Sequence, residues 1–447
     1  MRALTGAARR RVAVIGSGVS GLTAAWVLAR DCEVVLYEAD SRLGGHAHTH
    51  RLPGRADGSG DDLGVDSGFI VHNDRTYPTL LRLFGELGVR TQESDMSMSV
   101  RCDGCGLEYA GAKGPRGLIP EPAALLRRPY LRMLGEIIRF HRLARAELAT
   151  GTDEPRTLGE FLADCAFTPY FTAHFMVPLV AAVWSCPPRL ALRYPARYLF
   201  TFLDHHGMLT VFGSPTWRTV TGGSASYVRA VAARLHEVRA GVPVRSVHRG
   251  AHTVGVRDDA DEVEFFDAAV IATHPEQALR LLDSPTIAES HILAGLPYTV
   301  NRVLLHTDDS VLPRRSGARA SWNYRLPHCT ATPERVQVSY DLTRLQRLPD
   351  GPGDRRFLAT LGDDGRVAPE TVLATMDYEH PQYTPESMIA RRRLTEIGDH
   401  TVAFAGAYHG WGFHEDGALS GLRAAERIGG RWHASPATAA SVIREPS

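Results

Sequence analysis

The stretch RVAVIGSGVSGLTAAWVLARDCEVVLYE, residues 11–38, decides the fold of this chain. Its apolar run Arg11–Ile15 predicts a buried strand, its alanine-rich run Leu22–Ala29 predicts a helix, and Glu33–Tyr37 predicts a second strand. Together they form a βαβ unit with the pattern G-x-G-x-x-G between the first strand and the helix. That combination is typical of a Rossmann-like domain that binds a dinucleotide.

The three glycines of this motif have different expected roles. Gly16 makes the tight turn after the strand, Gly18 lets the backbone approach a pyrophosphate, and Gly21 allows the helix to pack closely on the strand. The N-terminus of the helix offers free N–H groups to the phosphates. Glu38 ends the second strand, where it is placed to accept the hydroxyl groups of an adenosine ribose. An acid there disfavours a 2′-phosphate, so NADP is a poor candidate ligand.

The bulk composition excludes several classes of protein. The 447 residues suffice for two domains with cores of their own. Fifty acidic side chains balance fifty basic ones, which argues against a nucleic-acid-binding surface. No apolar run approaches the ~18 residues of a membrane span, and we expect a cytoplasmic protein.

The patterns of strands and helices indicate two interleaved domains. Beyond the first unit we expect strands over Leu63–Val71 and Phe265–Thr273, a helix over Thr76–Gly88 and a last helix over Leu419–Ile428. The expected nucleotide-binding domain takes residues 1–75, 217–275 and 400–432, the substrate domain takes 76–216 and 276–399, and a disordered tail takes 433–447.

Two patterns raise the question of a metal site. Cys102-Asp-Gly-Cys105 has the spacing of a zinc-binding pair, but the sequence shows no second pair, and we expect reduced thiols in a hairpin, with a redox pair as the alternative. His46, His48 and His50 alternate, which is typical of a loop beside the cofactor or, less often, of metal ligands. The sequence therefore predicts no metal.

A basic helical pattern over Pro122–Leu148, interrupted near Pro129, has two interpretations. It is typical of a solvated face that covers the substrate domain. It is also typical of a helix that lies on an anionic membrane surface. Its arginines are Arg127, Arg128, Arg132, Arg139, Arg142 and Arg145.

The residues after Glu38 carry a resemblance to a known family. Glu38-Ala39-Asp-Ser-Arg42-Leu-Gly44-Gly45 is similar to the E-x3-R-x-G-G extension of the flavoprotein superfamily that contains amine oxidases and phytoene desaturases. In that superfamily the arginine and the paired glycines run beside the pyrophosphate and ribityl chain of FAD. The resemblance implies non-covalently bound FAD as the cofactor.

Three further segments narrow the resemblance. They are residues 65–78 (VDSGFIVHNDRTYP), 301–306 with 321–324 (NRVLLH and SWNY), and 406–417 (GAYHGWGFHEDG). Together they resemble the bacterial predicted NAD/FAD-binding oxidoreductases that often accompany cyclopropane-fatty-acyl synthase-like methyltransferases. The resemblance implies an α/β fold, with a GR2-type Rossmann-like FAD-binding domain and an interleaved α+β substrate domain. It also implies a hydrophobic or lipid-like substrate and a methyltransferase partner.

The resemblance assigns cofactor contacts residue by residue. Val244 would lie against the adenine, Thr273 near the pyrophosphate, and Gly68 and Phe69 near the isoalloxazine. The full set expected to bind FAD is Gly16, Gly18, Ser20, Gly21, Glu38, Ala39, Arg42, Gly44, Gly45, His46, Gly68, Phe69, Ile70, Val244, Thr273, Gly406, Glu415, Asp416, Gly417 and Ala418.

One departure from the family pattern concerns the last segment. The Asp416-Gly417-Ala418 turn is expected to open the last helix toward the flavin. Ala407 stands where many flavoproteins place an acid that binds the ribityl chain. That contact is therefore expected from Glu415 or Asp416.

The single lysine of the chain, Lys113, bears on the reaction. Amine oxidases of the superfamily commonly use a lysine near the flavin N5, and a lone lysine in a Gly-Ala-Lys-Gly-Pro loop makes that arrangement a poor expectation. Hydride transfer to flavin N5 from a hydrophobic, unsaturated acyl or polyene chain needs no lysine. The alternatives are a flavin-dependent double-bond isomerase without net oxidation, an amine oxidase, and a non-catalytic partner of a methyltransferase.

Four residues are candidates for acid–base work: His46, Tyr408, His409 and His414. Histidine exchanges a proton near neutral pH, and aromatic rings flank flavins and polyenes. Each has a structural alternative, in which it bonds only to a phosphate or to the backbone. The chain shows no second G-x-G-x-x-G motif, so we expect no separate NAD(P)H site.

Overall fold

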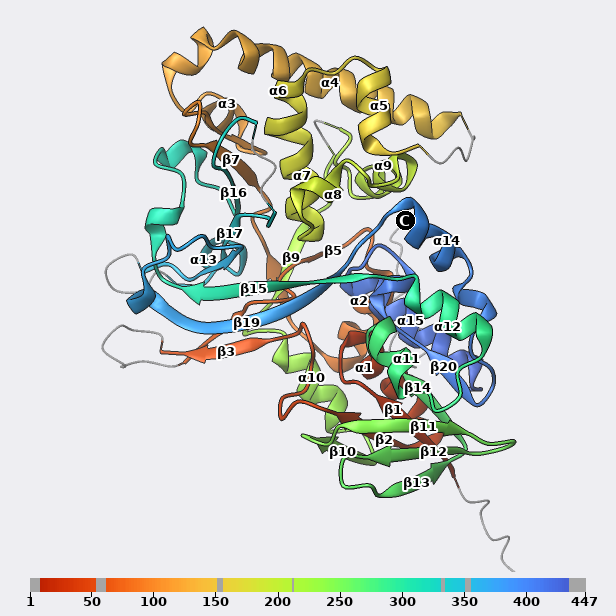
Figure 1. Ribbon diagram of the computed structural model, residues 1–447. Coiled ribbons are helices and arrows are strands. Elements are labelled where there is room, and N and C mark those ends of the chain that lie inside the picture. Colours follow the sequence, from red (N-terminus) through yellow and green to blue (C-terminus); the bar gives the residue numbers. More distant parts are fainter. Residues whose placement is uncertain are drawn as a thin grey trace, which may run out of the picture.

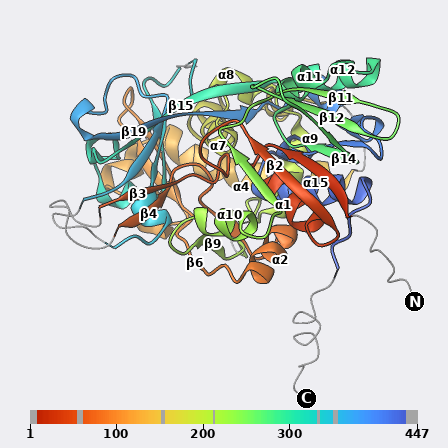
Figure 2. The ribbon, with the colours of Figure 1, turned by 90° about the horizontal axis from the view of Figure 1, so that it is seen from below.

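The computed structural model describes residues 9–53, 62–150, 156–210, 213–330, 334–349 and 355–433. Figure 1 and Figure 2 show two views of the chain. Apart from His433, the tail for which disorder was expected lies outside the described residues.

A five-stranded parallel sheet forms the centre of one half of the molecule. Its strand order is β10-β2-β1-β14-β20, and the strands are β1 (Arg10–Ile15), β2 (Cys32–Glu38), β10 (Glu237–Ala240), β14 (Ala268–Ile271) and β20 (Val402–Phe404). The runs are almost continuously apolar because both faces of the sheet are covered. The expected βαβ unit and the α/β fold class are confirmed.

Helices cover one face of this sheet. They are α1 (Val19–Leu28), α2 (Pro78–Leu87), α10 (Ala225–Ala232) and α15 (His414–Arg427). α1 and α15 pack closely, and a Cβ on Gly421 would collide with the carbonyl oxygen of Ser20. The last helix begins at His414 and not at Leu419, so residues 416–418 belong to its first two turns.

The other face of the parallel sheet is covered by a small sheet and by helices. The small antiparallel sheet contains β11 (Val244–Arg249), β12 (Val254–Asp258) and β13 (Val263–Phe266). The helices are α11 (Pro275–Leu281), α12 (Ile287–Ala294) and α14 (Pro385–Arg392). The single strand expected over Phe265–Thr273 is in fact two, because the chain leaves the small sheet at Asp267 and enters the parallel sheet as β14.

A seven-stranded mixed sheet forms the centre of the other half. Its order is β19-β15-β18-β17-β16-β7-β8, with β7 (Met98–Cys102), β8 (Glu108–Gly111), β15 (Tyr298–His306), β16 (Trp322–Leu326), β17 (Val338–Asp341), β18 (Leu358–Leu361) and β19 (Val372–Pro381). The long antiparallel pair β15 and β19 runs across the molecule from this sheet toward the parallel sheet (Figure 1). Residues at the Tyr298 and Pro381 ends of this pair therefore reach the nucleotide-binding half.

A helical layer packs over the seven-stranded sheet, at the top of Figure 1. Its elements are the 3-10 helix η1 (Pro122–Leu126), α4 (Arg128–Ala149), α5 (Leu158–Asp164), α6 (Pro169–Phe171), the π-helical segment η2 (Thr172–Met176), α7 (Val177–Trp184), α8 (Pro188–Ala191) and α9 (Ala196–His205). The interruption expected near Pro129 falls between η1 and α4.

Short elements complete the fold. They are α3 (Gly114–Leu118), α13 (Leu342–Leu345), the pair β3 (Thr49–Leu52) and β4 (Leu63–Asp66), and a small sheet of β5 (His72–Asn73), β6 (Thr91–Glu93) and β9 (Trp217–Val220). The strand expected over Leu63–Val71 ends at Asp66 because Gly68 packs against the backbone of His46.

The packing bears on the expected domain boundaries. The strands of the parallel sheet fall within 1–75, 217–275 and 400–432. α2, α11, α12 and α14 come from the segments expected in the substrate domain, yet their apolar side chains pack with the parallel sheet. The domain boundaries stay a prediction, and from these four helices we propose boundaries later than residue 75 and residue 275, and earlier than residue 400. Within the described ranges, no helix is long and apolar enough to cross a membrane.

Candidate functional site

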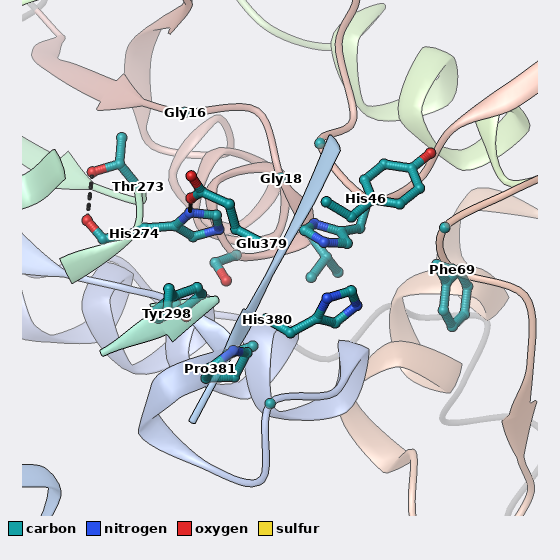
Figure 3. Close-up of a pocket in the computed structure, with 18 of the residues that line it drawn as sticks. Gly16, Gly18, His46, Phe69, Thr273, His274, Tyr298, Glu379, His380 and Pro381 are labelled. Atoms are coloured by element: carbon teal, nitrogen blue, oxygen red, sulfur yellow. Dashed lines mark hydrogen bonds and ion pairs between the residues drawn. The ribbon is translucent and has the colours of Figure 1, made fainter. Parts of the chain in front are cut away.

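A cavity of about 850 Å³ lies between the two halves and contains most of the residues singled out from the sequence. Its lining comes from the glycine loop before α1, the end of β2, the segment 67–71, α7, the β15–β19 pair and the segment 406–414. Figure 3 shows its central part. This size is in the range of pockets that hold small molecules or cofactors.

The glycine loop has the geometry expected of a phosphate-binding turn. Gly16 has φ +100°, and a Cβ there would lie 2.7 Å from the Ala272 carbonyl oxygen. A Cβ on Gly21 would collide with the Gly16 carbonyl oxygen, so helix α1 packs on the turn itself. Gly18 differs, because a Cβ there would meet no protein atom within 4 Å. The space beside Gly18, at the N-terminus of α1, fits the pyrophosphate of a dinucleotide.

Glu38 is held at the end of β2 by backbone donors. Its Oε2 accepts a hydrogen bond from the Ser17 N–H at 2.9 Å, and its Oε1 accepts one from the Asp40 N–H at 3.0 Å. Glu38, Ala39 and Val244 all line the cavity. A fixed carboxylate beside an apolar wall suits an adenosine group.

The Arg42 side chain stabilises the loop of residues 43–47 by hydrogen bonds to its backbone. Its guanidinium donates to the carbonyl oxygens of Leu43 and Ala47 at 3.2 Å and of Gly45 at 2.9 Å. Gly44 and Gly45 both have positive φ, 114° and 56°, which favours glycine. Arg42 and Gly45 line the cavity, whereas Gly44 lies behind its surface, where its N–H donates to the Ser17 hydroxyl.

The segment 67–70 lies against the same loop. A Cβ on Gly68 would collide with the His46 carbonyl oxygen, which also accepts a hydrogen bond from the Phe69 N–H at 2.7 Å. The Phe69 ring stacks on His414, with ring centroids 3.6 Å apart and an interplanar angle of 11°. Gly68, Phe69 and Ile70 line the cavity as expected for residues near an isoalloxazine.

Three histidines gather where the long strand pair reaches the cavity (Figure 3). His46 lies 5.5 Å from His380 and 6.4 Å from His274, measured between ring centroids. His274 bonds to the Glu379 carboxylate and stacks on Tyr298 at 4.4 Å. All five residues line the cavity.

Burial favours the neutral form of two of these histidines, His46 and His380. Burial, with a further contribution from His380, holds the pKa of His46 well below its ordinary value. Burial, with a further contribution from His274, lowers the pKa of His380 to about 4. An uncharged imidazole has a lone pair that can accept a proton, and a lowered pKa favours release of that proton to the next acceptor.

Sequence reasoning missed His274, Tyr298, Tyr378, Glu379 and His380. Tyr298, Tyr378, Glu379 and His380 reach the cavity through the pairing of β15 with β19, two strands that are far apart along the chain. His274 instead follows β14 and is the N-cap residue of α11. One signal was available: Tyr378-Glu-His-Pro381 ends a strand and places two titratable groups next to a proline.

The segment 406–414 is divided between the cavity and the core. Gly406, Ala407, Phe413 and His414 line the cavity. Burial lowers the pKa of His414 to about 3. Within the described residues, Tyr408 and His409 do not line the cavity. Tyr408 is buried with its ring against Gly406, and His409 is held close to Arg391 and Arg423.

The two acids expected to bind the ribityl chain have other partners. The Glu415 carboxylate accepts hydrogen bonds from the N–H groups of Thr79 and Leu80 at the start of α2. The Asp416 carboxylate accepts one from the Phe413 N–H at 2.9 Å. Burial raises the pKa of Glu415 and raises that of Asp416 to about 6. Neither acid lines the cavity, because the helix begins at His414 and carries both of them past it.

Gly417 and Ala418, which were also expected to bind FAD, pack away from the cavity as well. A Cβ on Gly417 would lie 2.6 Å from Val19 Cγ1, and Ala418 is fully buried between α15 and its neighbours. They bring α15 close to α1. Ser20 and Thr273, by contrast, line the cavity on the side of the glycine loop.

The other end of the cavity is apolar and aromatic. Trp184 ends α7, Trp322 begins β16, and Tyr340 lies in β17 with its ring 5.3 Å from that of Trp322 and perpendicular to it. Val303 and Leu361 complete this wall. Lys113 lies elsewhere, where its Nζ donates to the Arg319 carbonyl oxygen at 2.6 Å.

The open cradle at Gly18, the fixed acid at Glu38 and the cavity that leads to an aromatic pocket fit an enzyme that binds a dinucleotide beside its substrate. Residues 19–364 match the model of the family described as flavin containing amine oxidoreductase, and the chain belongs to that family. FAD is its cofactor. None of the curated proteins matches the chain significantly.

Solved structures share the fold over nearly the whole chain. A putrescine oxidase bound to putrescine is 15% identical, with a TM-score of 0.66, and the match covers 94% of this chain and 98% of that one. Cyclohexylamine oxidase from Brevibacterium oxydans is 16% identical, with a TM-score of 0.64 and the same coverage. The CLA-producing fatty acid isomerase from P. acnes is 16% identical, with a TM-score of 0.64, and the match covers 92% and 97%.

Proposed function

We propose that this oxidoreductase acts by hydride transfer to flavin N5 from a hydrophobic, unsaturated acyl or polyene substrate. The observation that carries the proposal is the wall of Trp184, Trp322, Tyr340, Val303 and Leu361 at the end of the cavity. These five side chains offer apolar area and no carboxylate to balance an ammonium group. The two carboxylates that β19 adds to the cavity lining already have partners, because Asp377 lies 3.6 Å from Arg302 and Glu379 bonds to His274. Such a surface favours an uncharged chain over an amine.

The position of the lone lysine supports the same choice. Lys113 is bonded to the Arg319 carbonyl oxygen and is not among the described residues that line the cavity. The amine-oxidase arrangement with a lysine beside the flavin therefore has no support in this chain. Amine oxidation remains an alternative that the substrate test below addresses.

Bound FAD supplies the hydride acceptor. The protein itself has to hold the substrate, exclude water and move one proton. The aromatic wall holds the apolar chain, and His46 is the best-placed proton acceptor, since its neutral ring lies in the cavity beside Tyr378 and His380. His414 is the second candidate because it lines the cavity and stacks on Phe69.

A double-bond isomerase is the second candidate function. The same wall and the same neutral histidines would serve a substrate whose hydride leaves and returns, with no net oxidation. The structural similarity to the fatty acid isomerase favours this alternative, because that fold relative is named for a substrate of the same apolar class. Both functions use the same cavity.

An anaerobic titration of the FAD-loaded protein with an unsaturated fatty acid or its ester tests the proposal. Lasting loss of the oxidised flavin absorbance, with a product two hydrogens lighter, is the result expected of a desaturase or oxidase. Oxidised flavin with a product of unchanged mass would indicate the isomerase. Bleaching by amines alone would contradict the proposal.

We also propose that the outer side of the helical layer contacts an anionic membrane that supplies the substrate. η1 and α4 expose four large apolar side chains: Leu126 is 84% exposed, Ile138 67%, Leu125 50% and Leu131 41%. The exposed arginines of α4 are Arg128, Arg132, Arg142 and Arg145. Apolar and basic groups together favour a surface with anionic headgroups.

Vesicle sedimentation tests this contact. The protein is expected to sediment with vesicles that contain phosphatidylglycerol and to remain in solution with vesicles of phosphatidylcholine alone. Leu126→Asp should weaken the sedimentation, whereas Phe265→Asp on the exposed strand β13 should leave it unchanged. A methyltransferase partner stays a proposal from the family resemblance, tested by co-purification with a tagged form of this chain.

A further inference from the structure

Four potential metal ligands meet at a point outside the cavity. Cys102 ends β7, Cys105 lies in the turn between β7 and β8, His174 lies in η2, and Cys329 follows β16. Their ligand atoms all lie within 4.8 Å of one another, and none of the four residues lines the cavity. Cys102 and His174 are fully or almost fully buried. His174 and Cys329 do not form a recognisable motif in the sequence. His174 is 69 residues from Cys105, and Cys329 is 227 residues from Cys102.

The separations suit a tetrahedral metal better than a disulfide. The Sγ atoms of Cys102 and Cys329 are 3.7 Å apart, and Cys105 Sγ is 3.7 Å from His174 Nε2. Four ligands at the ~2.3 Å distance of a zinc–sulfur bond are ~3.8 Å from one another in a tetrahedron. A disulfide requires a separation of ~2.05 Å.

His174 is oriented toward the three sulfur atoms by its surroundings. Its Nδ1 donates to the Tyr170 carbonyl oxygen at 3.0 Å, which leaves Nε2 as the free lone pair on the side of the thiols. The ring also stacks on Tyr170, with centroids 3.9 Å apart. The histidine lies in a π-helical segment, a local distortion that is frequent at functional sites.

The turn that carries Cys102 and Cys105 is shaped to bring its backbone close to Cys329. A Cβ on Gly104 would lie 3.1 Å from both the Cys329 N atom and the His328 Cα atom. Gly106 has φ +68°, and its N–H donates to the Cys102 carbonyl oxygen at 2.9 Å. Both glycines therefore serve the approach of the two cysteine-bearing segments.

We propose that Cys102, Cys105, His174 and Cys329 bind one Zn²⁺ ion in a closed tetrahedral site. Three thiolates and one imidazole form a ligand set that is typical of structural zinc, and four protein ligands leave no open position for a reaction. This assignment replaces the expectation of reduced thiols without metal, which rested on the absence of a second sequence pair.

The ion would fasten the ends of β7 and β16 in the seven-stranded sheet to the helical layer. β7 and β16 lie next to α6 and α7 (Figure 1). α7 leads to Trp184 and β16 begins with Trp322, both in the aromatic wall of the cavity. Zinc binding would thus support the substrate end of the cavity without touching FAD. The site does not depend on which reaction the cavity performs.

Metal analysis of the FAD-loaded protein, purified without chelators, is the first test. We expect about one zinc per chain in the unaltered protein and less than about a tenth of that in Cys105→Ser and His174→Ala. Cys165→Ser is the matched control, because Cys165 is a free thiol outside the group and should leave the zinc content unchanged. Absence of zinc after reconstitution with a zinc salt and a reductant would overturn the proposal.

Two measurements on the unaltered chain keep the test valid if the variants fail to fold. Replacement of the ion by Co²⁺ should give the sulfur-to-cobalt charge-transfer band and the d–d bands of a tetrahedral site. Titration with an organic mercurial should release zinc as three thiols react. A cobalt spectrum of an octahedral, oxygen-bound ion, or a thiol count that is two short because of a disulfide, would contradict the assignment.

Discussion

Gly18 and Gly45 lie backbone to backbone in the wall of the cavity, so that a Cβ on Gly45 would come within 3.2 Å of Gly18 Cα. The other side of Gly18 is open, since a Cβ there would meet no protein atom within 4 Å. The protein itself thus leaves room at Gly18, and FAD is the group that requires it. The reason for a glycine at position 21 is different: a Cβ there would collide with the Gly16 carbonyl oxygen, so the protein's own packing requires Gly21.

Substitutions at Gly18 and at Gly21 should therefore have different effects. Gly18→Val is expected to fold and to lose at least about tenfold in FAD affinity, or ~1.4 kcal/mol, because its side chain would occupy the phosphate site. Gly21→Val is expected to unfold at a lower temperature with or without added FAD. Flavin fluorescence and thermal denaturation measure the two effects. Gly85→Ala, on the exposed side of α2, is the control that should keep FAD affinity unchanged and should not lower the unfolding temperature.

His46 should be needed for the reaction more than for the cofactor. His46→Gln is expected to retain FAD and to lose about 10²-fold or more in kcat, because it removes a buried neutral base that lines the cavity. The flavin spectrum and steady-state kinetics separate the two readouts. His306→Gln, at a buried histidine in β15 that does not line the cavity, is the comparison. If kcat is unchanged in His46→Gln, His46 is not the proton acceptor, and His380 or His414 becomes the candidate for that role.

The sequence predicted the nucleotide-binding half well because its signals are local. The strand, glycine turn, helix and acid of residues 11–38 are contiguous, and each glycine has a steric reason that can be read in advance. The expected roles of Glu415 and Asp416 failed for a different reason. A family pattern aligns residues, but one turn more of helix at His414 carries both carboxylates to other partners.

The substrate half could not be predicted in the same way. Its cavity residues come from strands β15 and β19, whose register is set only when the sheet forms. The proposed zinc ligands also meet only in the folded protein. His174 and Cys329 come from segments distant from the Cys102–Cys105 pair, which alone is recognisable in the sequence. Local sequence patterns do not encode such long-range pairings.

The single lysine gives a test between oxidation of amines and of neutral chains. Lys113→Met is expected to change kcat by less than about twofold, because the Nζ atom bonds to a backbone carbonyl away from the cavity. Steady-state kinetics on the substrate found by the anaerobic titration measure this. A loss of about 10²-fold or more would show that the lysine reaches the flavin and would support amine oxidation.

The aromatic wall should determine affinity for the substrate. Trp322→Ala removes a ring that lines the cavity and contacts Tyr340, and it is expected to raise KM by about tenfold or more. The flavin should remain bound, since Trp322 lies at the end of the cavity away from the glycine loop. Phe265→Ala, on an exposed strand, is the control for a general effect of aromatic removal. A KM equal to that of the unaltered enzyme would place the substrate elsewhere.

Buried neutral histidines should make the protein sensitive to mild acid. Burial lowers the pKa of His306 from its ordinary value of 6.5 to about 4, and its Nδ1 accepts a hydrogen bond from the Asp308 N–H. Between these two pKa values the unfolded chain binds a proton that the folded chain does not, so the free energy of unfolding falls as the pH falls from 6.5 toward 4. Asp66 acts in the opposite direction, because burial raises its pKa to about 6. The histidines whose pKa is lowered to about 3 or 4 by burial outnumber such acids: His48, His72, His206, His306, His380, His409 and His414.

His306→Gln isolates one member of that group. The unaltered protein should lose stability between about pH 7.5 and about pH 5, and the variant should lose about 2 kcal/mol less over the same interval, because glutamine takes up no proton in the unfolded chain. Urea denaturation at the two pH values measures the difference. The comparison between pH values removes the constant cost of losing the His306–Thr360 hydrogen bond. Equal losses in both proteins would mean that His306 is protonated in the folded state already at about pH 5, which its burial in β15 argues against.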